Sequence, residues 1–152
     1  MGSSCKSKNE SMKPLMPENM APAKTLENTV SDFDKGYLQD DLEKMFADVD
    51  TAAMFYGTDP TESWNYSTFK DMVKSHFQNK LPKMTLKNTH IIYSPDNTSA
   101  MVVRDIDWQL YKTPIRQDLF YALEKNRWIL KGLTLNLTMS NANTQKMNDA
   151  IK

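Results

Sequence analysis

The spacing of apolar residues in the first half of the chain predicts three amphipathic helices. The first begins after Thr25 and has an apolar stripe formed by Leu26, Val30, Phe33 and Tyr37. A short second helix is predicted over residues 39–47, "QDDLEKMFA", because two aspartates precede its apolar positions and suit the positive end of the helix dipole. The third follows Ser67 as its N-cap and runs until Pro82 forbids continuation, with one face formed by Phe69, Met72, Val73, His76, Phe77 and Lys80.

Other segments have the pattern of strands. The stretch "TAAMFYGTD", residues 51–59, is typical of a buried strand that ends at Gly57. After Pro82, turn signals separate four more predicted strands, at residues 86–93, 100–112, 115–125 and 127–139. Helices followed by hairpin-linked strands indicate an α+β fold, with the three N-terminal helices packed in the concave face of a curved antiparallel sheet. Such a cone is filled by side chains at its narrow end and open at its wide end.

The two ends of the chain lack this patterning. Residues 1–22 are rich in serine, lysine, asparagine and proline without a sustained period, and we interpret them as a disordered tether. Residues 140–152 are polar and predict a frayed tail with at most one helical turn. The folded domain is therefore expected over residues 23–139, which is enough for one hydrophobic core.

Charge and cysteine content exclude several classes of function. The chain has 19 basic and 19 acidic residues, so it offers no overall basic field for nucleic acid, and we expect no nucleic-acid partner. No apolar run approaches the roughly 20 residues that span a bilayer. The single cysteine, Cys5, excludes an internal disulfide. His76 and His90 are the only histidines and lack ligand spacing, so we predict neither a metal site nor a cofactor.

A resemblance enters at "FYGTDPTESW", residues 55–64. The order of a short helix with "DDLEKMF", a strand ending in this stretch, an amphipathic helix and antiparallel strands is similar to the SnoaL-like branch of the nuclear transport factor two superfamily. Members often show Gly-Thr-Asp-Pro, an acidic residue and Trp before the third helix, which here are Gly57, Thr58, Asp59, Pro60, Glu62 and Trp64. The late "LEKNRWILKGLTL" is similar to the usual ending of the family, and the resemblance covers residues 23–139.

The resemblance implies an α+β cone, often dimeric through the outer sheet face, with a deep pocket at its open end. The superfamily includes polyketide cyclases, ketosteroid isomerases, dehydratases and non-catalytic binding modules, so fold alone does not decide function. The catalytic residues of the isomerases cannot be aligned with this chain position by position, and isomerase chemistry is not carried over.

Several residues are candidates for lining the pocket. In residues 55–64, Tyr56, Asp59 and Trp64 could rim it, although each also has a turn or packing role, and we interpret the stretch mainly as a turn. His76 lies on the apolar face of the third helix and is either a pocket acid, base or donor or a packed core histidine. The full predicted lining is Phe55, Tyr56, Asp59, Trp64, His76, Trp108 and Phe120.

The segment "VVRDIDWQLY", residues 102–111, has charged residues on both faces of a predicted strand. Arg104 and Trp108 share one face, and Asp105 and Asp107 share the other, about 7 Å apart along the strand. Two such carboxylates could raise each other's pKa and supply a general base, so Asp105, Asp107 and His76 are the catalytic candidates. The alternative is a solvated outer face or an ion pair with Arg116 or Arg127.

Cys5 follows "GSS" and precedes a polar, lysine-rich segment. This resembles the mature start of a bacterial lipoprotein, with Cys5 as the site of lipid attachment and the tether as spacer. A myristoylated start is the rival, although Lys6 occupies the position that wants Ser or Thr, and an incidental cysteine is the third interpretation. The first predicts a bacterial cell envelope location with membrane contact only through the lipid, and the last a cytoplasmic one.

The leading hypothesis from the sequence is a small-molecule-binding module that takes an apolar or mixed-polarity ligand and forms a homodimer through the sheet. The alternative is an enzyme doing general acid–base chemistry of isomerase, cyclase or dehydratase type in the same pocket. A third interpretation is a protein-interaction module that uses the outer sheet face.

Overall fold

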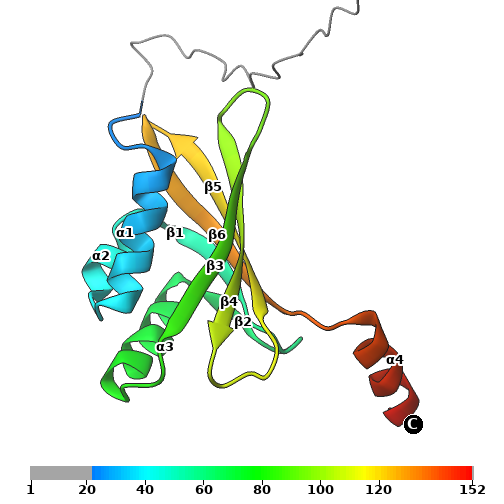
Figure 1. The fold of residues 1–152 in the computed structure, drawn as a ribbon. Coiled ribbons are helices and arrows are strands. Elements are labelled where there is room, and N and C mark those ends of the chain that lie inside the picture. Colours follow the sequence, from blue (N-terminus) through cyan, green and yellow to red (C-terminus); the bar gives the residue numbers. More distant parts are fainter. Residues whose placement is uncertain (1–21, 152) are drawn as a thin grey trace, which may run out of the picture.

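The computed structural model describes residues 22–151 as one α+β unit (Figure 1). Cys5 and all but the last residue of the predicted tether lie outside this range, so lipid attachment stays a prediction. The elements follow in the order α1 (Leu26–Leu38), α2 (Leu42–Phe46), β1 (Val49–Tyr56), β2 (Ser63–Asn65), α3 (Tyr66–Gln78), β3 (Met84–Tyr93), β4 (Ser99–Trp108), β5 (Ile115–Glu124), β6 (Arg127–Leu137) and α4 (Asn141–Ala150).

Capping side chains explain where the helices begin. Thr25 accepts a hydrogen bond from the backbone N–H of Asn28 at the start of α1. The N-cap of α3 is Asn65 rather than the predicted Ser67, because the Asn65 side chain accepts from the backbone N–H of Thr68 at 3.0 Å. Ser67 donates its hydroxyl to the same Asn65 oxygen and supports the cap. The helix therefore begins two residues earlier than the cap assignment predicted.

The six strands form one sheet in the order β2-β1-β6-β5-β4-β3. Hairpins join β3 to β4, β4 to β5 and β5 to β6, so these four strands are antiparallel, as expected. The pairing of β1 with β6 is parallel, which differs from the expected antiparallel order. The reason is that β1 reaches the rest of the sheet through α3 instead of a hairpin, and such a crossover permits parallel pairing. The short β2, which was not predicted, pairs with β1 at the edge.

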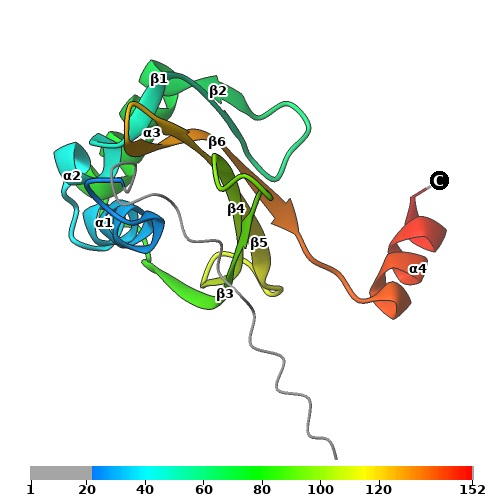
Figure 2. The same cartoon turned by 90° about the horizontal axis from the view of Figure 1, so that it is seen from above.

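The three predicted helices cover one face of the curved sheet, as Figures 1 and 2 show. Apolar side chains from α1, α2 and α3 meet the concave face there and form the core. Phe55 of β1 is fully buried and stacks on Phe69 of α3, with ring centroids 3.9 Å apart. Gly36 of α1 lies directly against the backbone of Met45 in α2, and a Cβ at this position would lie 2.5 Å from the Met45 Cα. The two helices therefore pack at backbone distance.

A β-bulge interrupts β3. Lys87 pairs with Asp105 and His90 with Val103, so Asn88 and Thr89 together oppose a single residue of β4. Asn88 has a φ of +51°, in the left-handed region that residues other than glycine rarely adopt, and its side-chain amide donates to Asp105 at 3.0 Å.

The C-terminal segment forms a longer helix than predicted. Helix α4 spans 10 residues where a frayed tail with one turn was expected, and Ser140 caps it by accepting from the backbone N–H of Asn143. None of its residues is buried, and the helix lies apart from the cone in Figures 1 and 2. Polar composition hid the helix because its capping supports it without an apolar face.

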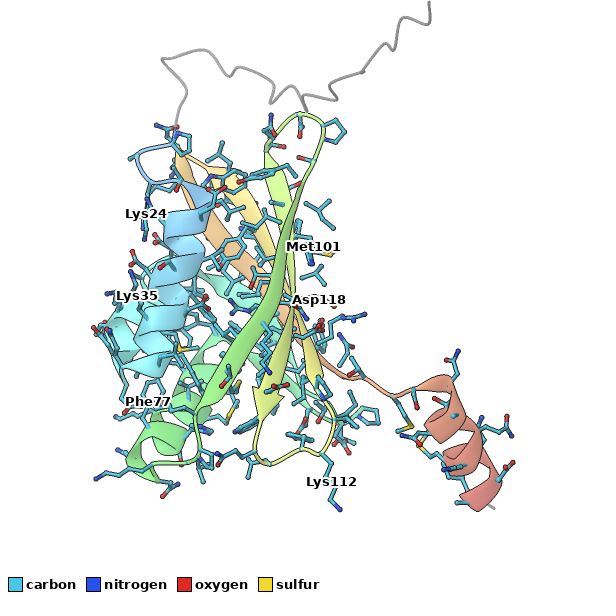
Figure 3. All side chains as sticks on the ribbon, in the orientation of Figure 1. Lys24, Lys35, Phe77, Met101, Lys112 and Asp118 are labelled. Atoms are coloured by element: carbon cyan, nitrogen blue, oxygen red, sulfur yellow. The ribbon has the colours of Figure 1, made fainter. Side chains whose placement is uncertain are left out.

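The convex face of the sheet is divided into two halves. Ile92, Met101 and Phe120 pair across β3, β4 and β5 and are each at least 44% exposed. Charged and polar side chains occupy the other half, among them Arg116 and Asp118. Figure 3 shows Met101 and Asp118 on the side away from the helices. We call the first three residues the convex apolar row.

Candidate functional site

A pocket opens between the helices and the concave face of the sheet. Its volume is about 90 Å³, and side chains from α1, α2, α3, β3, β4, β5 and β6 line it. Most of its wall is apolar, as with Phe33, Val73, Leu86, Ile106 and Leu133. The volume corresponds to about three water molecules of liquid water, so only a small molecule or the end of a larger one would fit.

A buried polar group forms one part of the lining. Arg104 of β4 is 2% exposed, and its Nε donates to Gln117 Oε1 of β5 at 2.7 Å. Its Nη1 donates to Asp34 Oδ2 of α1 at 2.7 Å, and Nη2 lies 2.6 Å from Asp34 Oδ1. Asp34 therefore balances the charge of Arg104 inside the fold, as a buried guanidinium requires. We call Asp34, Arg104 and Gln117 the polar triad.

A second polar pair lies where the pocket lining is half-buried. Tyr37 Oη and His76 Nε2 are 2.8 Å apart, and the His76 ring lies 5.7 Å from that of Trp108. Burial lowers the pKa of His76, helped by the charge of Lys83 and opposed by Asp40. Burial also raises the pKa of Tyr37 to about 12. Both side chains are therefore neutral near pH 7, and the tautomer of His76 decides which of them donates in their hydrogen bond.

Lys83 contacts residues of both α1 and α3 beside the Tyr37–His76 pair. Its ammonium group forms an ion pair with Asp40 and donates to the backbone carbonyl of Tyr37 at 3.1 Å. It also lies 5.1 Å from the ring centroid of Phe77. Trp108 is held in turn by its indole N–H, which donates to the carbonyl of Pro82 at 2.9 Å. These contacts fix the orientation of the aromatic wall.

Of the seven predicted lining residues, the structure brings His76 and Trp108 into this pocket. Phe55 lies beneath it in the core, and Trp64 packs 6.1 Å from the ring of Phe69. Phe120 points outward and is 46% exposed, because it alternates with the inward Leu119 and Tyr121 on β5. Phe120 therefore belongs to the convex apolar row.

Tyr56 and Asp59 lie at a separate, shallow depression beside β6. The backbone N–H of Gly57 donates to the carbonyl of Glu62, and the Asp59 carboxylate accepts from the backbone N–H of Thr61 at 2.8 Å. Hydrogen bonds from the Thr61 hydroxyl and backbone lower the pKa of Asp59. Residues 57–62 thus form a hydrogen-bonded turn between β1 and β2, in line with the structural interpretation of this stretch.

Asp105 and Asp107 lie on the convex face and not in the pocket. Asp105 accepts from Asn88 and contacts Arg116 at 3.5 Å, while Asp107 forms an ion pair with Lys87. The hydrogen bond from Asn88 lowers the pKa of Asp105, where mutual repulsion of the two aspartates would have raised it. This corresponds to the outer-face alternative. Of the three catalytic candidates, His76 alone lines the pocket.

Sequence reasoning did not select Asp34, Gln117 or Tyr37 as site residues. Arg104 did carry a signal, since it alternates with the apolar residues Val102 and Ile106 on the inward face of its strand. An arginine in such a position needs an anionic partner. The sequence does not show which aspartate supplies it, because Asp34 is 70 residues away.

Residues 22–151 offer neither a metal-binding cluster nor a membrane-spanning helix. Residues 22–151 contain no group of three or more histidine, cysteine or acidic side chains placed to hold a metal ion. Within the same range, no helix has both the length and the apolar character that crossing a membrane requires.

Comparison with known proteins identifies one matching family. The family described as the SnoaL-like domain matches residues 26–131. No curated protein sequence matches the chain.

Solved structures give the same architecture at low sequence identity. A protein with a cystatin-like fold from Caulobacter vibrioides has a TM-score of 0.67 at 9% identity, covering 83% of this chain and 96% of that one. An NTF2-like protein of unknown function from Pseudomonas putida KT2440 has a TM-score of 0.61 at 7% identity, covering 78% and 87%. A protein proposed to be a ketosteroid isomerase, from Shewanella frigidimarina NCIMB 400, has a TM-score of 0.59 at 10% identity, covering 72% and 92%. These likenesses confirm the α+β cone and extend no further than the fold.

Proposed function

The chain belongs to the SnoaL-like domain family, and from the pocket in its cone we propose that it binds a small, largely apolar molecule. The observation that carries this proposal is an apolar pocket that contains a few fixed polar groups, which is the usual composition of small-molecule sites. The apolar wall supplies affinity, because removing apolar surface from water contributes about 25 cal/mol per Å². The polar groups would orient the ligand.

The size of the pocket limits what enters it. A volume of about 90 Å³ is below the roughly 300 Å³ of common ligand sites. We therefore propose that the ligand inserts a terminal group, such as part of a ring, while the rest extends past the exposed side chains of Leu38 and Met72.

Filling the pocket is expected to weaken ligand binding strongly. Leu86→Trp puts an indole into the space beside Ile106, whereas Leu110→Trp adds the same side chain at a position 55% exposed and outside the pocket lining. Ligand-observed NMR with a panel of small neutral cyclic compounds should detect binding to the wild type and to Leu110→Trp, with at least about tenfold weaker binding to Leu86→Trp. Equal binding to both variants, or none to the wild type, would contradict the proposal.

A second candidate function is general acid–base catalysis, which the Tyr37–His76 pair favours. A neutral histidine inside an apolar pocket can accept a proton from a bound molecule near pH 7, and in the tautomer whose Nε2–H donates to Tyr37 Oη the Nδ1 atom is the base. Asp105 and Asp107 have no part in this candidate, since they face away from the pocket.

Catalysis would appear as proton exchange in a bound ketone. We expect the wild type to accelerate deuterium incorporation next to the carbonyl of cyclohexyl methyl ketone in D₂O, followed by ¹H NMR. His76→Gln should slow this by about 100-fold, while His90→Gln on the exposed outer face should not. A wild-type rate equal to buffer would leave binding as the function.

We also propose that the convex apolar row mediates a homodimer. Three large apolar side chains paired across neighbouring strands form a contiguous surface that association would remove from water. Phe120→Glu places a charge at the middle of the row, so sedimentation should show a dimer for the wild type and a monomer for the variant. A monomeric wild type at tens of micromolar would refute this.

A further inference from the structure

The formal charges around the pocket cancel. Asp34 and Arg104 are the charged side chains of its lining and pair with each other, while burial lowers the pKa of His76 and so keeps it neutral near pH 7. Lys83, beside Tyr37, is paired with Asp40. We infer that Asp34 determines the charge of the ligand: it neutralises Arg104, so that the pocket takes neutral molecules with a hydrogen-bond acceptor and rejects carboxylates. The inference rests on the proposed binding function and goes beyond it by naming the ligand class.

The polar triad offers donors without partners. A guanidinium has five N–H groups, and three of those on Arg104 face Gln117 and Asp34. The amide nitrogen of Gln117 has no acceptor among the residues that the structure describes, although its side-chain oxygen is taken by Arg104. Gln117 is 7% exposed and lines the pocket, and neither its amide nitrogen nor any Arg104 nitrogen is both fully buried and without a partner. A ligand oxygen in the pocket would therefore accept a hydrogen bond that water can otherwise accept.

A neutral acceptor fits this arrangement better than an anion. A carboxylate near Arg104 would also lie near Asp34, and the repulsion from Asp34 would offset most of the attraction. The carboxylate would in addition lose more hydration on entering an apolar pocket than the few N–H groups there could replace. A ketone, ester or similar oxygen loses much less hydration and needs only the free N–H groups.

Removing the charge of Asp34 should therefore reverse the preference. Asp34→Asn keeps a side-chain oxygen that can accept from Arg104, but it leaves the guanidinium without a counter-charge. A ligand carboxylate can then supply the missing negative charge. The same substitution should leave affinity for a neutral ligand nearly unchanged, because the free donors remain.

Two probes of matched shape test the inference. Cyclohexyl methyl ketone and cyclohexanecarboxylate share the ring and differ in the charge of the terminal group, and isopropylcyclohexane is the uncharged shape control without an acceptor. Dissociation constants would be measured by NMR titration at pH 7.5 for the wild type, Asp34→Asn and Asp32→Asn. The last variant removes a charge from the same helix at a residue outside the pocket lining.

We expect the wild type and Asp32→Asn to bind the ketone about tenfold more tightly than the carboxylate or the hydrocarbon, and Asp34→Asn to prefer the carboxylate by a similar factor. If Asp34→Asn is largely unfolded alone, cyclohexanecarboxylate should raise its melting temperature more than the ketone does at the same concentration. A wild type that binds ketone and carboxylate equally, or an Asp34→Asn variant that retains the wild-type preference, would overturn the inference while leaving the binding function in place. A wild type that binds none of the three probes would overturn the binding function as well.

Discussion

Replacing Arg104 with methionine is expected to lower the free energy of unfolding by about 3 kcal/mol. The substitution leaves Asp34 without its positive partner and takes the donor away from the Gln117 oxygen. Breaking a buried ion pair costs about 3–5 kcal/mol, and the lower value applies because the Asp34 side chain keeps 18% of its exposure. Urea denaturation of the wild type and the variant would measure the difference.

The double variant Asp34→Leu/Arg104→Met separates the charge imbalance from the loss of packing. Replacing both members of a buried ion pair by apolar groups is often neutral, so the double variant should recover most of the lost stability. If it is instead less stable than Arg104→Met alone, the pair contributes through its own hydrogen bonds, and the uncompensated charge is not the cause of the loss.

Gly36→Ala is expected to destabilise the fold by about 2–3 kcal/mol, although alanine favours helices by about 1 kcal/mol over glycine. The added methyl group would lie 2.5 Å from the Cα and 2.7 Å from the Cβ of Met45. Relief requires α1 and α2 to move apart, and both contribute to the pocket wall. Thermal and urea unfolding would give the change in stability.

Gly132→Ala is the matched control for this substitution. A Cβ at Gly132 would meet its nearest neighbour, the carbonyl oxygen of Met54, at 3.3 Å, which a small adjustment can relieve. We expect a loss below about 1 kcal/mol at this site. Equal effects of the two substitutions would mean that the close approach of α1 to α2 is not what Gly36 provides.

The spacing of apolar residues along the chain was sufficient to predict most helices and strands of the fold. The apolar stripes identified α1, α2 and α3, a buried apolar run identified β1, and strand-like periods between turn signals identified β3 to β6, because burial imposes these patterns directly. The parallel pairing of β1 with β6 was not predictable in the same way. Alternation shows which face of a strand is buried, but neighbouring strands and their direction depend on the path of the whole chain.

The site was less predictable than the fold. His76 and Trp108 were found because each interrupts an apolar face with a residue able to form hydrogen bonds. Asp34 escaped because an aspartate on an amphipathic helix usually faces solvent, and only the position of Arg104 in three dimensions shows otherwise. Asp105 and Asp107 attracted attention as a pair, but strand alternation gave their shared face without saying whether it was concave or convex.

The bulge in β3 limits which insertions and deletions this strand can accept. The inward-facing residues of β3 have even numbers before the bulge, as with Met84 and Leu86, and odd numbers after it, as with Ile91 and Tyr93. A deletion of Asn88 or Thr89 would restore regular alternation and turn one of these sets outward. Insertions and deletions should therefore be tolerated between β3 and β4, around residues 94–98, and selected against inside β3.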